Sequence, residues 1–144
     1  MGMRKSLGIV LAAALLEFAA RGVAVRLGAE LRGNPGVAFG LLGGTPSLAC
    51  LLSALSLAAL LFCLWRFPHP GLSVMAGGAV ANLIDRLLSG SVMDWIPLSF
   101  SEHFIEGGLR FNLADVEISL GAAAVLWEAL ASADKKEGEG EPSP

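Results

Sequence analysis

The sequence predicts an all-α integral membrane protein built around four transmembrane helices. Hydrophobic residues make up 54% of the 144 residues, and the mean hydropathy is +0.65. Charged residues make up only 16%, whereas a soluble domain contains about 25%. The apolar residues also gather in four stretches of about 20 residues, the length that crosses a bilayer as a helix.

The four predicted spans are separated by segments that break helices. They run roughly over Ser6–Leu27, Pro46–Phe67, Gly71–Ser89 and Asn112–Ala131. The basic start and the apolar run after it also fit a signal peptide, but three further spans follow, so we expect an uncleaved first helix. Two prolines in Phe67–Gly71 predict a tight turn. We expect one domain over residues 1–131 and a disordered, acidic, cytoplasmic tail over residues 132–144.

The two long connections differ from the spans in composition. Gly28–Thr45 is rich in glycine and poor in helix formers, which favours irregular or β structure beside the membrane. Gly90–Arg110 is a second such loop, in which Trp95, Phe100 and Phe104 are spaced as membrane-interface anchors. The basic residues that fall on one side of a four-span chain are Arg4, Lys5, Arg66, Lys135 and Lys136. This bias predicts that both termini are cytoplasmic and both long connections lie outside.

Composition and spacing argue against several other classes of function. A net charge of −3 provides no basic surface, so we expect no nucleic-acid partner. Cys50 and Cys63 would lie about 20 Å apart on a straight helix, too far for a disulfide. His69 and His103 fall on opposite sides of the predicted membrane, which argues against a histidine-based zinc site or triad. We therefore expect no metal and no cofactor.

Two aspartates lie next to membrane spans, where the cost of burying a charge indicates a function. Asp94 follows the third span and Asp115 opens the fourth, and an ionisable residue at membrane depth costs about 2.5–3.5 kcal/mol. Gly90 suits the left-handed residue past a helix end, so the chain can turn Asp94 back toward the bundle. Singly, Asn112 is explained as a helix N-cap and Asp115 as an acid favoured by the helix dipole. Those explanations do not account for two acids occurring together.

Polar residues within the spans form a second group. Asn82, Asp85 and Arg86 share one helix face because they are three and four residues apart. They are explained equally well as a polar cluster that holds helices together and as residues with a direct function. In the first span, Glu17 and Arg21 are one turn apart, and we expect a partly buried ion pair between them.

A close pair of carboxylates has a definite chemical use. Two like charges cannot both ionise without a large cost, so the pair shares one proton. One member takes a proton from water while the other hydrogen-bonds the substrate carbonyl, which hydrolyses a peptide without a metal or a covalent intermediate. Asp94 and Asp115 therefore predict catalysis at a membrane surface.

Three sequence blocks, in order, carry a more specific signal. Asn34–Gly40 matches the pattern N-x-G-x-[AS]-F, Gly77–Asp94 matches G-G-x-x-x-N-x-x-D-R…G-x-V-x-D-[FW], and Phe111–Asp115 matches F-N-x-A-D. These blocks resemble those of the lipoprotein signal peptidases, the type II signal peptidases of bacteria. The resemblance extends from Leu16 to Leu130, nearly the whole chain.

The resemblance implies a four-helix transmembrane aspartic endopeptidase with a small extracytoplasmic β-cradle and a short amphipathic loop or helix. It implies Asp94 and Asp115 as the catalytic pair. The residues implied to bind substrate are Asn34, Gly36, Asn82, Arg86 and Asn112, and those implied to support the site are Asp85, Glu17 and Arg21. The implied substrate is a diacylglyceryl-modified prolipoprotein, cut before its lipidated cysteine in the bacterial cytoplasmic (inner) membrane. We expect a monomer in contact with membrane phospholipids.

The chain departs from the family pattern at three places. Phe18 replaces the glutamine of a D-Q-x-x-K motif that here covers Glu17–Arg21, and Ala81 replaces a glycine. Glu117 adds an acid roughly 200° around the helix from Asp115. Phe18 and Ala81 motivate a second hypothesis, a catalytically silent protein that binds lipidated peptides. A third is a small transporter subunit with a proton relay, but the acids cluster at one face, which favours the enzyme.

Overall fold

The computed structural model describes residues 1–36, 45–104 and 108–138. Within these residues the body of the molecule consists of four long helices, α1 (Met3–Arg26), α2 (Pro46–Arg66), α3 (Pro70–Ser89) and α4 (Leu113–Gly138). Each contains a segment long and apolar enough to cross a membrane. The four expected spans are therefore confirmed, with ends that shift by a few residues everywhere except at the end of α4.

The last helix is longer than the sequence predicted. It continues to Gly138, whereas we expected it to end near Ala131 and to be followed by a disordered tail over residues 132–144. That expectation was wrong for residues 132–138, which contain alanine, lysine and glutamate, all strong helix formers, and no proline. Residues 139–144 lie outside the described residues.

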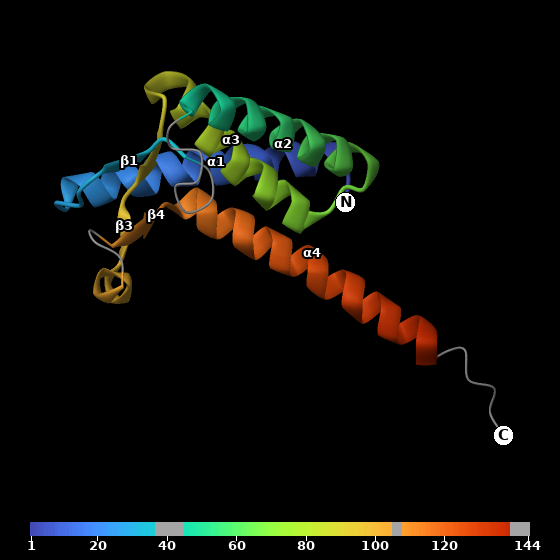
Figure 1. Ribbon diagram of the computed structural model, residues 1–144. Coiled ribbons are helices and arrows are strands. Elements are labelled where there is room, and N and C mark those ends of the chain that lie inside the picture. The colour runs from blue at the N-terminus through green and yellow to red at the C-terminus, as the bar shows by residue number, and fades with distance from the viewer. Residues whose placement is uncertain (37–44, 105–107, 139–144) are drawn as a thin grey trace.

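The third helix is the centre of the bundle. It packs against each of the other three helices (Figure 1). A Cβ atom on Gly77 would lie 2.5 Å from the Cβ of Ala13 in α1, and one on Gly78 would lie 2.5 Å from the carbonyl oxygen of Ala114 in α4. The buried apolar side chains between the helices are mostly small, namely Val10, Ala14, Leu64, Ala76, Ala81 and Ala114. Small residues therefore set the close spacing of α3 and its neighbours.

Short strands gather at one end of the bundle (Figure 1). β1 (Arg32–Asn34) pairs with β2 (Val92–Asp94), and β3 (Ile96–Leu98) pairs with β4 (Leu109–Phe111), both antiparallel. One turn of 3-10 helix, η1 (Ser99–His103), follows β3. The small β structure and the short helix are the ones the family resemblance implied.

The strands also test what the sequence predicted for the two connections. β structure was expected between α1 and α2 and is confirmed at β1, while residues 37–44 lie outside the described residues. The second connection, for which irregular or β structure was likewise expected, contains β2, β3, η1 and β4. The sequence did not place the individual strands, because each is three residues long, too short to show an alternating pattern.

Candidate active site

The two aspartates are positioned by the ends of α3 and α4. Gly90 ends α3 with φ 71°, in the left-handed region, and its N–H donates to the carbonyl oxygen of Arg86 at 3.0 Å. The chain then reverses into β2, whose last residue is Asp94, only 3% exposed. Asp115 lies in the first turn of α4. The turn that the sequence predicted at Gly90 is therefore confirmed, and it returns Asp94 to the bundle.

Asn112 caps α4 and also contacts the other aspartate. Its Oδ1 accepts the N–H of Asp115 at 2.8 Å, and Oδ2 of Asp115 accepts the N–H of Asn112 at 3.2 Å. Its Nδ2 donates to Oδ1 of Asp94 at 3.1 Å and to Oδ1 of Asn82 at 3.0 Å. The predicted N-cap is thus present, and the same side chain joins both acids.

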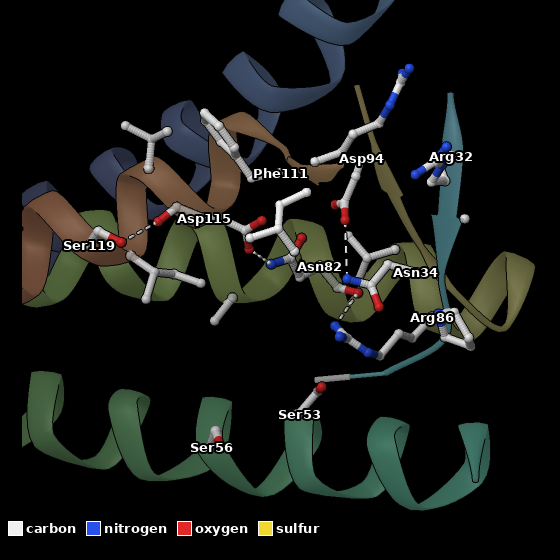
Figure 2. A pocket seen from close by; sticks show the side chains of 18 of the residues that line it. Arg32, Asn34, Ser53, Ser56, Asn82, Arg86, Asp94, Phe111, Asp115 and Ser119 are labelled. Atoms are coloured by element: carbon white, nitrogen blue, oxygen red, sulfur yellow. Dashed lines mark hydrogen bonds between the residues drawn. The ribbon is translucent and has the colours of Figure 1, made fainter. Parts of the chain in front are cut away.

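Two further asparagines complete the contacts of the acids. Nδ2 of Asn82 donates to Oδ1 of Asp115 at 3.0 Å, and Nδ2 of Asn34 donates to Oδ2 of Asp94 at 3.1 Å. Together with Asn112, side chains from β1, β2, α3 and α4 therefore form one hydrogen-bonded network. Figure 2 shows two of its hydrogen bonds, from Asn34 to Asp94 and from Asn82 to Asp115. We call these five residues the acid network: Asn34, Asn82, Asp94, Asn112 and Asp115.

Arg86 and Gly36 stand beside the acid network. Nη2 of Arg86 donates to the carbonyl oxygen of Gly36 at 2.7 Å, and Nη1 to that of Asn82 at 3.4 Å. The N–H of Gly36 donates to Oδ1 of Asn34 at 3.1 Å, which orients the Asn34 amide toward Asp94. These two residues thus fix the β1 side of the site.

The expected Glu17–Arg21 ion pair is a minor contact. Nε of Arg21 lies 3.8 Å from Oε1 of Glu17, whereas Nη1 and Nη2 of Arg21 reach the two oxygens of Asp85 at 2.5 and 3.0 Å. The sequence rule for residues one turn apart missed this partner because Asp85 comes from α3, 64 residues along the chain. The expected partly buried Glu17–Arg21 ion pair is therefore confirmed, and Asp85 is a second, closer partner of Arg21 that the sequence did not predict.

The two supporting acids, Asp85 and Glu17, accept hydrogen bonds from residues that lie close to the aspartates in the chain. Oδ2 of Asp85 accepts the N–H of Met93 at 3.1 Å, directly before Asp94. Glu17, 1% exposed, accepts from Nε1 of Trp95 at 3.1 Å and from the N–H of Leu113 at 2.8 Å. The sequence treated Trp95 only as an interface anchor, although its place next to Asp94 was a signal for a role at the site.

A cavity of about 1030 Å³ opens beside the acid network. Around the acids it is polar, and between α2 and α4 it is lined by apolar side chains such as Leu52, Val116 and Leu120. Figure 2 shows Asp94, Asp115 and Asn82 directed into this space, with Ser53 and Ser56 of α2 across from them. The cavity can therefore hold a ligand that is polar at one end and apolar at the other.

The surroundings of Asp94 favour its protonated form. Burial raises the pKa of this carboxyl from 3.8 to about 6, and the nearby charge of Asp115 adds to the increase. Hydrogen bonds from Asn34 and Asn112 and the charge of Arg86 act in the opposite direction on the pKa. A raised pKa in one acid of a close pair favours the shared-proton arrangement that this kind of catalysis uses.

Glu117 is buried apart from the acid network. It is 6% exposed on α4, and within the described residues neither of its carboxyl oxygens has a hydrogen-bond partner. No group of three or more potential metal ligands occurs in the described part of the chain either.

Four membrane-length helices with a buried Asp94 and a half-buried Asp115 at one end of the bundle are the arrangement expected of a membrane-embedded aspartic peptidase. The signal peptidase (SPase) II family matches residues 9–131, which is most of the chain. The chain belongs to this family, as its three sequence blocks predicted.

Similar proteins agree with this assignment. A lipoprotein signal peptidase of Cellvibrio japonicus (strain Ueda107) is 36% identical over 76% of this chain and 68% of its own length. One of Sinorhizobium fredii (strain NBRC 101917 / NGR234) is 35% identical over 71% of this chain and 64% of its own length. The chain thus spans about two thirds of the length of these relatives. A solved bacterial membrane enzyme shares the fold, with a TM-score of 0.74, 19% identity, and coverage of 99% of this chain and 94% of that one.

Proposed function

We propose that this protein removes signal peptides from diacylglyceryl-modified prolipoproteins, with Asp94 and Asp115 as the catalytic residues. The observation that carries the proposal is the acid network, in which Asn82 and Asn112 bridge the two carboxyls. Retention of both acids in a bonded arrangement supports an enzyme over a silent peptide-binding protein.

The reaction follows from the different tasks of the two acids. Asp94, whose pKa is raised to about 6, carries the shared proton and donates it in a hydrogen bond to the scissile carbonyl oxygen. Asp115 takes a proton from a water molecule as that water attacks the carbonyl carbon. The tetrahedral intermediate collapses when the C–N bond breaks and Asp115 returns the proton to the leaving amine. Substrate in the cavity excludes further water, which favours the protonated form of Asp94.

The asparagines of the acid network, with Gly36 and Arg86 beside it, hold the acids in place for the substrate. Asn34, Asn82 and Asn112 orient the carboxyls, and Gly36 and Arg86 fix the segment that carries Asn34. The acid network is complete within a single chain, so the proposed chemistry requires no residue from a second copy.

The membrane sets how substrate arrives. The lipidated cysteine is anchored by its acyl chains, so the substrate enters sideways, with these chains against the apolar wall between α2 and α4. Basic residues flank the opposite end of the bundle, which supports cytoplasmic termini and an active site at the outer face. Phe100 and Phe104, 66% and 84% exposed, lie in η1 and just after it and suit contact with phospholipids at that face.

The test is cleavage of a lipidated prolipoprotein by the purified protein and its variants. Asp94→Asn and Asp115→Asn should each abolish cleavage while the protein stays folded in detergent, because either change removes the shared-proton pair. Glu102→Gln, an exposed acid in η1, is the matched control and should retain activity. Substantial activity in either aspartate variant would contradict the assignment.

A second arm of the experiment tests recognition of the lipid. The same peptide without its acyl chains should be cleaved far more slowly at equal concentration, because each buried CH₂ group contributes about 0.8 kcal/mol to partitioning. Equal rates would indicate a more general membrane protease.

A further inference from the structure

Two arginines at the outer end of the cavity have no part in the proposed chemistry. Arg32 on β1 and Arg110 on β4 line the same cavity as Asp94 and Asp115. In the strand pairing, Arg32 lies opposite Asp94. Figure 2 shows Arg32 beside Asp94, on the side of the cavity away from α2.

These arginines connect the two chain segments at the cavity mouth. Nη1 of Arg32 donates to the carbonyl oxygen of Gly108, next to β4, at 3.4 Å. In return, Arg110 donates to Glu30, two residues before β1, through Nη1 to the carbonyl oxygen at 3.0 Å and through Nη2 to Oε2 at 3.1 Å. The mouth is thus bordered by two positive charges from opposite sides.

We propose that Arg32 and Arg110 select substrates with an acidic side chain at the second or third residue of the mature protein, the lipidated cysteine being the first. This inference rests on the proposed function. Cleavage before the cysteine keeps the signal peptide in the membrane, so the residues after the cysteine leave through the mouth. An extended chain advances about 3.3 Å per residue, so these two residues pass at the level of Arg32, one strand from Asp94.

The electrostatics of the mouth give the arginines their effect on specificity. An acidic substrate residue there approaches Asp94, Asp115 and Glu30, all of which repel it if ionised. Arg32 and Arg110 reverse this repulsion and supply charge-assisted hydrogen bonds to the carboxylate.

Glu30 occupies Arg110 in the absence of substrate. Its side chain is 81% exposed, and that of Arg110 is 18% exposed. An ion pair with one partner so exposed contributes little and exchanges readily. The substrate carboxylate therefore replaces the Glu30 carboxylate on Arg110 as the peptide enters.

The test compares lipidated peptides that differ only by aspartate or asparagine at the second mature residue. The readout is the ratio of their kcat/KM values. The wild-type protein should prefer the aspartate peptide by about fivefold at low salt, the upper range for an exposed ion pair, and the preference should fall as salt is added. Arg32→Gln and Arg110→Gln should each lower the ratio toward one, and Arg110→Lys should retain part of it.

Two further variants separate specificity from general damage. Glu30→Gln removes the competing carboxylate and should raise the ratio above that of the wild type. Lys5→Gln, an exposed charge at the far end of α1, should leave the ratio unchanged. A wild-type ratio of one, or a ratio unaffected by both arginine variants, would overturn the proposal. Loss of cleavage of both peptides by the wild-type protein would instead overturn the proposed function.

Discussion

Breaking the Arg21–Asp85 ion pair should destabilise the fold, and the coupling between its two partners should be measurable by a double-mutant cycle. The side chains are 14% and 9% exposed, and they meet through two hydrogen bonds between α1 and α3. In Asp85→Ala, the Arg21 guanidinium keeps one ionic contact, to Glu17 at 3.8 Å. The change also leaves the N–H of Met93 without its acceptor. Removing one partner of such a pair costs about 3–5 kcal/mol.

The assay is thermal unfolding in detergent, followed by tryptophan fluorescence. At about 3 °C per kcal/mol, Asp85→Ala should lower the Tm by about 10 °C. Arg21→Ala should have a similar effect, because it leaves the Asp85 carboxylate without its cation. The double variant should be more stable than the sum of the single effects predicts by about 2 kcal/mol or more.

A matched cycle on Glu17 and Arg21 serves as the control. Their single contact at 3.8 Å should give a coupling energy below about 1 kcal/mol. Additive effects in the Arg21–Asp85 cycle, or a larger coupling in the Glu17–Arg21 cycle, would refute the assignment of partners.

Two further predictions concern buried acids. The folded protein holds the Asp94 proton up to about pH 6, whereas the unfolded chain loses it near 3.8, so the stability due to Asp94 should fall as the pH rises from about 4 to 6. Infrared titration of the Asp94 carboxyl should show a midpoint near pH 6. The midpoint should rise in Asn34→Ala, which loses a hydrogen bond to the ionised form, and fall in Asp115→Asn, which removes a nearby negative charge. A midpoint near 4 in the wild-type protein would contradict the reasoning. Glu117→Met should raise the Tm, because it removes a buried carboxyl that has no hydrogen-bond partner among the described residues. The same change at the exposed Glu102 should not raise the Tm. A lower Tm in Glu117→Met would contradict this reasoning.

The sequence alone determined the parts of this protein that depend on local pattern. Runs of about 20 apolar residues define the four spans because a bilayer demands that length. Gly90 defines the turn after α3 because its φ of 71° disfavours other residues. The sequence also singled out Asp94 and Asp115 as candidate catalytic residues, because ionisable residues beside membrane spans are rare without a function.

The tertiary structure decided which side chains meet. Local spacing assigned Arg21 to Glu17, but the packing of α1 on α3 brings Asp85 within 2.5 Å of it. Glu17 likewise meets Trp95 and Leu113, and Arg32 meets the carbonyl oxygen of Gly108 across the cavity mouth. Sequence periodicity reports neighbours within one helix or strand, whereas these contacts join residues more than 60 positions apart and exist only once the helices have packed.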